Sequence, residues 1–223
     1  MRAPSNGARV PVTALDLASY AGLLALTLLT VNLLLGLLMA VKYNPVRQWP
    51  HRRISTFQLH NWTAYAALAV GGAHPVILLF SGPVHFRVVD LLYPLNGPRQ
   101  PLVNSLGALA LYALLFIGIT SYFRRAIGRT WWKRLHFTAY GMAPIFYVHG
   151  ILTDPELGDT PFHLDPLDGE KLYVELCLVL VLVAVAIRVR RQLRQPPPRA
   201  HRPKAPRAIG VARHRRAPVG SRW

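Results

Sequence analysis

Two apolar segments of the chain carry matching polar landmarks: LHNWTAYAALAVGGAH at residues 59–74 and LHFTAYGMAPIFYVH at residues 135–149. Each begins with Leu-His, continues through Thr-Ala-Tyr and ends on a second histidine. The two histidines are 14 residues apart in the first segment and 13 apart in the second. Both segments are apolar enough to sit in a bilayer, where a titratable side chain is costly and usually has a function.

The composition around these segments indicates a polytopic membrane protein, because 52% of the 223 residues are hydrophobic. Five stretches have the length of a membrane-spanning helix, at residues 19–41, 57–80, 103–123, 131–152 and 172–191. The first is longer than the apolar region of a signal peptide, and no small-residue cleavage site follows it. We therefore expect it to be a retained anchor helix.

The basic residues, which give a net charge of +17, alternate between the two sides of these spans. Two precede the first span, the successive loops carry four, two, five and one, and twelve lie in residues 188–223. By the positive-inside rule this predicts an N-terminus outside and a C-terminus inside. The charge is thus explained by topology, and membrane lipid rather than nucleic acid is the expected partner.

Three parts of the chain are expected: an N-terminal segment 1–14, a membrane domain 15–194 and a tail 195–223. The tail is rich in Pro and Arg, contains no acidic residue and has little to bury, so we expect it to be disordered. The single cysteine, Cys177, excludes a disulfide framework, a Cys-rich zinc or iron–sulfur site and the CxxCH attachment of c-type heme.

The predicted topology places the four histidines at two depths. His60 and His136 lie near the cytoplasmic ends of their helices, and His74 and His149 lie near the outer ends, about 20 Å away along each helix. Two imidazoles per level, without a nearby carboxylate or thiolate, form a poor cage for zinc or copper. They suit the axial ligation of a b-type heme, whose porphyrin supplies the other four nitrogens. The alternative for each single histidine is a hydrogen bond to a neighbouring helix.

Small residues beside the histidines, namely Thr63, Ala64, Gly71 and Ala139, would let a flat macrocycle approach the backbone, although they would also favour plain helix packing. Candidate cations for the heme propionates are Arg52, Arg53, Arg125, Lys133 and Arg134 inside, and Arg87 and Arg99 outside. In an ideal helix a 14-residue spacing returns to within about 40° of the same face, but a 13-residue spacing misses it by about 140°. Pro144, between His136 and His149, can kink the helix and so change the rotation between the two histidines.

The histidine spacings, the RR at residues 52–53 and the WWKRLH at residues 131–136 resemble the ferric reductase-like transmembrane domain superfamily over about residues 41–187. That superfamily includes ferric-chelate reductases, NADPH oxidases and the heme-binding subunit of the bacterial methionine-sulfoxide reductase system. The resemblance implies an all-α bundle with two stacked b-type hemes, held by His60 and His136 on the inner side and by His74 and His149 on the outer side. Oxidase and reductase members commonly have six spans, and five are expected here.

Some oxidases of that superfamily place an aromatic residue between the hemes, where this sequence has Met142. Phe146 and Tyr140 are the nearby aromatic residues that could serve instead.

The expected function is transmembrane electron transfer in a bacterial-type plasma membrane. Because the sequence contains no GxGxxG motif, we expect an external donor: a cytoplasmic flavoprotein, reduced flavin (FMN or FAD) or a membrane quinol. The acceptor stays open between ferric iron, oxygen and an extracytoplasmic redox protein. The alternatives are an electron-carrier subunit of a separate reductase and a non-redox membrane protein that binds heme or merely packs its histidines.

Overall fold

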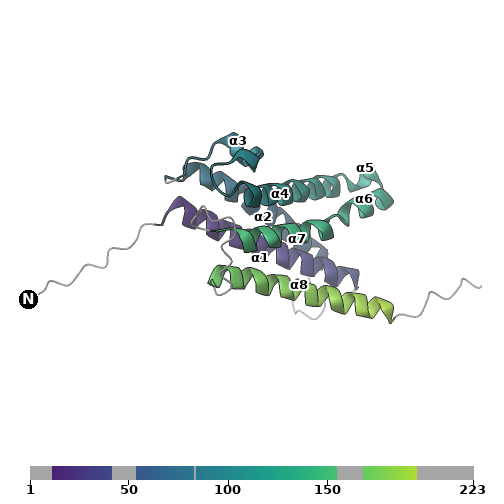
Figure 1. Cartoon of the computed structure of the whole chain (residues 1–223). Coiled ribbons are helices and arrows are strands. Elements are labelled where there is room, and N and C mark those ends of the chain that lie inside the picture. Colours follow the sequence, from purple (N-terminus) through teal and green to yellow (C-terminus); the bar gives the residue numbers. More distant parts are fainter. Residues whose placement is uncertain (1–11, 42–53, 83, 155–167, 195–223) are drawn as a thin grey trace, which may run out of the picture.

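The computed structural model describes residues 12–41, 54–82, 84–154 and 168–194. The described chain is all helical, as predicted: α1 (Ala14–Ala40), α2 (Thr56–Ile77), η2 (Leu78–Phe80), α3 (Val88–Leu92), η3 (Pro94–Asn96), α4 (Pro101–Tyr122), α5 (Arg124–Ile127), α6 (Arg129–His136), α7 (Ala139–Leu152) and α8 (Gly169–Leu193). The long helices lie along a common direction, with α3 at one end and α5 and α6 at the other (Figure 1). We call these the α3 end and the α6 end. The tail and the candidates Arg52 and Arg53 fall outside the described residues.

The starts of the first two helices follow from capping boxes in the sequence. Thr13 Oγ1 accepts from the backbone N–H of Asp16 at 3.2 Å, and the Asp16 carboxylate accepts from the backbone N–H of Thr13 at 2.8 Å. Ser55 and Gln58 make the same reciprocal pair at the start of α2. These bonds satisfy backbone N–H groups that a helix start leaves without partners.

Four of the described helices are long and apolar enough to cross a membrane, namely α1, Thr56–Phe80, α4 and α8, with mean hydropathies between 1.6 and 2.5. They coincide with four of the five predicted spans. Large apolar side chains on α8, such as Leu176, Leu180 and Val183, are half exposed, as expected for a surface that faces lipid. The chain is a multi-pass membrane protein.

The remaining predicted span, residues 131–152, is not one continuous helix, and it is not among the four helices long enough to cross a membrane. It divides into α6 and α7 at Phe137 and Thr138. The Thr138 hydroxyl donates to the Leu135 carbonyl at 2.6 Å, and such local bonds compete with regular helix formation. Pro144 lies within the uninterrupted α7, so it is not the site of the break.

The break also supplies part of the rotation that the 13-residue histidine spacing lacks. Three backbone bonds around it span three residues instead of four: Thr138 N to Leu135 O, Tyr140 N to Phe137 O and Gly141 N to Thr138 O. A 3₁₀ step turns the chain by about 120° and an α step by about 100°, so three tight steps add about 60°. The mismatch of about 140° for an ideal helix is thereby reduced by nearly half.

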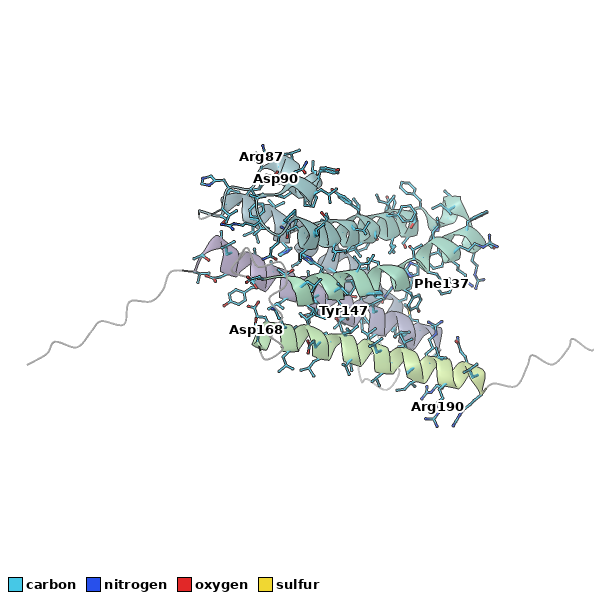
Figure 2. All side chains as sticks on the ribbon, viewed as in Figure 1. Arg87, Asp90, Phe137, Tyr147, Asp168 and Arg190 are labelled. Atoms are coloured by element: carbon cyan, nitrogen blue, oxygen red, sulfur yellow. The ribbon has the colours of Figure 1, made fainter. Side chains whose placement is uncertain are left out.

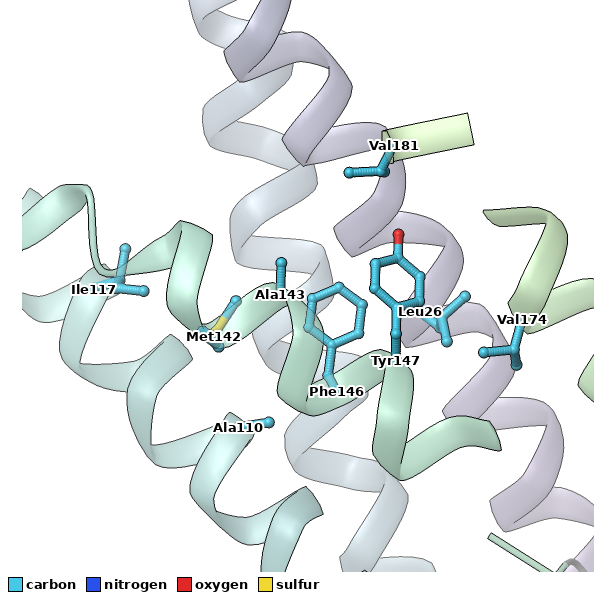
Figure 3. Close-up of a cluster of buried hydrophobic side chains, with 9 residues drawn as sticks. All are labelled: Leu26, Ala110, Ile117, Met142, Ala143, Phe146, Tyr147, Val174 and Val181. Carbon is cyan, nitrogen blue, oxygen red and sulfur yellow. The ribbon is translucent and has the colours of Figure 1, made fainter. Parts of the chain in front are cut away.

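The buried core lies between α1, α4, α7 and α8 (Figure 3). Its nine residues are Leu26, Ala110, Ile117, Met142, Ala143, Phe146, Tyr147, Val174 and Val181. Phe146 and Tyr147 contact each other, with ring centroids 4.4 Å apart, and the buried Tyr147 hydroxyl is 2.8 Å from Thr30 Oγ1. Met142 and Phe146 are therefore interior residues, whereas Tyr140 is 39% exposed and binds Arg188.

An ion pair between Arg87 and Asp90, both labelled in Figure 2, lies at the start of the short helix α3. Arg87 Nη2 lies 3.0 Å from Asp90 Oδ1, and the Arg87 backbone N–H donates to Asp90 Oδ2 at 2.9 Å. The Arg87 guanidinium, with this backbone donor, holds the pKa of the Asp90 carboxyl below its usual range. Arg87 is thus committed to Asp90, which weakens its candidacy as a propionate partner.

Because the folded-state pKa of Asp90 is depressed, its contribution to stability is present above the unfolded pKa of about 3.9 and is lost as pH falls through the folded pKa. We expect the backbone amides of residues 88–93 to lose protection from hydrogen exchange as the pH falls below about 4. Asp90→Asn should show the same loss already at pH 7. Mass spectrometry in detergent micelles would measure it, with α4 as internal reference, and equal exchange in the wild type and Asp90→Asn at pH 7 would contradict the assignment.

Candidate functional site

His60 and His136 are brought together at the α6 end. His60 lies in the second turn of α2, and His136 is the last residue of α6. Their ring centroids are 6.2 Å apart and their planes are inclined at 76°. Two imidazoles on opposite sides of one metal ion, with metal–nitrogen bonds of about 2.0–2.1 Å, would have centroids about 6 Å apart. This separation is compatible with one metal atom between the rings.

His74 and His149 both line a cavity at the α3 end. The empty space there, including the part open to the surface, is about 1350 Å³. Its walls are largely apolar and come from several helices, with Leu26 of α1, Leu111 of α4 and Phe146 of α7 among them. Several helices thus contribute to one largely apolar space that both histidines line.

Three of the four imidazoles are oriented by backbone carbonyls of a neighbouring helix. The Nδ1 atoms of His74, His149 and His60 lie 2.8, 2.8 and 3.1 Å from carbonyl oxygens. Those carbonyls belong to Ala18, Val103 and Asn32, in the same order. A carbonyl only accepts, so each Nδ1 carries the proton and donates, and Nε2 keeps its lone pair for a metal. Metal-bound histidines are commonly fixed in this way.

Helix α1 repeats this arrangement at two levels. Its two acceptor residues, Ala18 and Asn32, are 14 residues apart, and each is followed four positions later by a glycine, Gly22 or Gly36. The spacing equals that of the two histidines of α2, the helix that packs most extensively against α1. A Cβ atom at Gly22 would lie 3.1 Å from His74 Cε1, and one at Gly36 would lie 3.6 Å from His60 Cε1. These glycines leave room for the rings.

Helix α4 repeats the pattern for His149. Val103 supplies the carbonyl, and Gly107 follows four positions later. A Cβ atom at Gly107 would lie only 2.7 Å from His149 Cε1, closer than real Cβ contacts allow. Any larger residue there would have to displace the ring.

Sequence reasoning missed these glycines because it considered only the neighbours of each histidine on its own helix. Of the small residues it selected, Gly71 lines the cavity and faces Ala25 of α1, and Thr63 binds the Asn32 side chain at 2.8 Å. Asn32 Nδ2 also donates to the His60 carbonyl at 2.5 Å. The equal 14-residue spacing of glycines and histidines is a signal that could have revealed the arrangement.

The charged residues near the two histidine pairs differ between the ends. Arg125, Lys133 and Arg134 lie on α5 and α6, close to the His136 end of the bundle. Lys171 was not singled out by the sequence, yet it is only 4% exposed and lines the cavity that holds His74 and His149. Arg99 lies in the turn before α4, where its carbonyl accepts from Asn104 at 2.8 Å.

A comparison with family models finds a match to the ferric reductase like transmembrane component over residues 21–147, more than half of the chain. The chain belongs to the ferric reductase like transmembrane component family. The match confirms the predicted resemblance and extends it into α1, and it stops two residues before His149. Searches of curated proteins and of solved structures give no significant match.

Membership in the ferric reductase like family implies transmembrane electron transfer in general, and the family typically binds heme. The residues fit that group. Each end of the bundle offers two imidazoles. Among the described residues, no group of three His, Cys, Asp or Glu side chains could hold a metal ion. Three rings have Nδ1 engaged by a carbonyl, and each of these rings faces a glycine whose missing side chain leaves it room.

Proposed function

We propose that this ferric reductase like component is a two-heme b-type cytochrome that carries electrons across the plasma membrane. His60 and His136 would hold one heme, and His74 and His149 the other. The observation that carries the proposal is the presence of two histidine pairs at opposite ends of one bundle, with the rings oriented from α1 and α4. A bound heme supplies a one-electron iron couple, while the chain fixes the ligands, sets their tautomers and excludes water with apolar walls.

The proposed topology places the α6 end in the cytoplasm and the N-terminus outside. Basic residues gather at the α6 end and at the end of α8: Arg124, Arg125, Arg129, Lys133, Arg134, Arg188, Arg190, Arg191 and Arg194. The positive-inside rule favours this orientation. In this proposal α6 and α7 together make the fifth crossing, since α7 alone, with 14 residues, spans about 21 Å.

The proposed donor acts at the α6 end and is a flavoprotein, reduced flavin or a quinol. The basic surface there supports an anionic donor, because clustered positive charge attracts anions and speeds their association. The proposed acceptor, at the α3 end, is ferric iron, oxygen or an extracytoplasmic redox protein. If the acceptor is a redox enzyme, the chain would be its electron-carrier subunit.

The proposal predicts the cofactor content of the purified protein. The dithionite-reduced minus oxidised spectrum should show low-spin b-type bands, and the pyridine hemochromogen assay should give about two hemes per chain, since each pair of imidazoles completes one six-coordinate iron. His85→Ala, which removes a histidine outside the two pairs, should retain both hemes. Correctly folded protein without heme absorbance after expression with ample heme would refute the proposal and favour histidines that serve only in packing.

A further inference from the structure

His136 differs from the other three histidines in the partner of its Nδ1 atom. That atom lies 3.4 Å from the hydroxyl oxygen of Ser121 on α4, whereas the other three Nδ1 atoms lie 2.8 to 3.1 Å from backbone carbonyls. Ser121 is 14 residues after Gly107, the glycine that faces His149. At the α6 end, α4 therefore carries a side-chain hydroxyl in the position that corresponds to Gly107 at the α3 end.

The Ser121 hydroxyl is shared with a second donor. Trp132, one turn before His136 on α6, donates its indole Nε1–H to Ser121 Oγ at 3.3 Å. An indole nitrogen can only donate, so Ser121 Oγ must accept this bond, which leaves one lone pair for the Nδ1–H of His136. The Trp132 ring also stacks on the His136 ring, with centroids 5.2 Å apart and an interplanar angle of 28°. Two long hydrogen bonds thus share one oxygen.

The strength of the Nδ1–H bond affects the metal. A strong acceptor at Nδ1 raises the basicity of the imidazole, and a more basic ligand stabilises ferric over ferrous iron and lowers the reduction potential. A long bond to a shared hydroxyl does this less than a short bond to a carbonyl. On the proposed function, we infer that Ser121 is a positioning residue that tunes the reduction potential of the heme bound by His60 and His136, and that Trp132 weakens this effect by competing for the same hydroxyl.

Two substitutions should move that potential in opposite directions. Ser121→Ala removes the acceptor, so the potential should rise. Trp132→Phe keeps a ring stacked on His136 but removes the competing donor, so the Ser121–His136 bond should shorten and the potential should fall. Either change should alter the ratio of oxidised to reduced heme at a fixed potential by up to about tenfold, which corresponds to about 59 mV for one electron.

The matched control is Thr120→Val, in the neighbouring position of α4. The Thr120 hydroxyl is buried, but it donates within its own helix, to Phe116 O at 2.9 Å and to Ile117 O at 3.1 Å. Its removal should therefore leave both potentials unchanged. A spectroscopic redox titration of the full chain in nanodiscs would measure the wild type and the three variants. The heme that His136→Ala removes identifies the relevant transition.

The outcomes separate the inference from the proposed function. A wild type without heme would refute both. A wild type with two hemes whose potentials do not move in Ser121→Ala, or move equally in Thr120→Val, would overturn the inference alone. If Ser121→Ala fails to retain heme, Trp132→Phe decides, because it keeps the hydroxyl: a lowered potential supports the inference, and an unchanged or raised potential overturns it.

Discussion

Replacing His136 by alanine is expected to abolish the low-spin signal of the same heme that His60→Ala abolishes, and to leave the other heme in place. The two rings are 6.2 Å apart and come from different helices, so each should supply one axial ligand of one iron. Removing either imidazole breaks six-coordination, and the absorbance of the reduced b-type bands should fall by about half. Optical and electron paramagnetic resonance spectra of the purified variants would measure this.

The same reasoning pairs His74 with His149, since both line the cavity at the α3 end. His74→Ala and His149→Ala should each lose the low-spin signal of the other heme and keep the signal of the heme at the α6 end. The informative comparison is between His60→Ala and His74→Ala, whose sites lie 14 residues apart on one helix, or about 21 Å. If these two variants lost the same spectral component, the assignment of one heme to each end would be wrong.

Gly107→Ala is expected to disrupt the heme at the α3 end, although this residue is no proposed ligand. The added Cβ atom would lie 2.7 Å from His149 Cε1 and 2.8 Å from its Nε2, the atom proposed to bind the iron. Relief requires that the ring turn or that α4 move away from α7, and either movement strains the bond between His149 Nδ1 and the Val103 carbonyl. We expect loss of that heme or a high-spin spectrum, with the His60–His136 signal unaffected.

Gly118→Ala is the matched control, on the same helix and with the same change. Its Cβ atom would make an ordinary contact, 3.8 Å from Leu68 Cδ2. Alanine is a better helix former than glycine by about 1 kcal/mol, so this variant should be at least as stable as the wild type and keep both hemes. Unaltered spectra in Gly107→Ala would show that the site tolerates bulk there, and the ring would then have to sit elsewhere when heme is bound.

Much of the fold could be predicted from the chain alone. Apolar length identified α1, α2, α4 and α8, because a segment that crosses a hydrocarbon layer must satisfy its backbone internally and carry about 20 apolar residues. The histidine spacing predicted the family, which the comparison confirmed. Spacing along a helix converts directly into depth, so the association of His60 with His136 could be anticipated before any contact was known.

The details of the site depended on the tertiary structure, because they involve the rotation of one helix against another. The break at Phe137 and Thr138 is made by local hydrogen bonds that the apolar pattern does not encode. The acceptors on Ala18, Asn32 and Val103 are backbone atoms, which every residue possesses, so no residue type marks them. The sequence alone determined where the four histidines lie along their helices. Only the packing of α1 and α4 against α2, α6 and α7 decided how each ring is held.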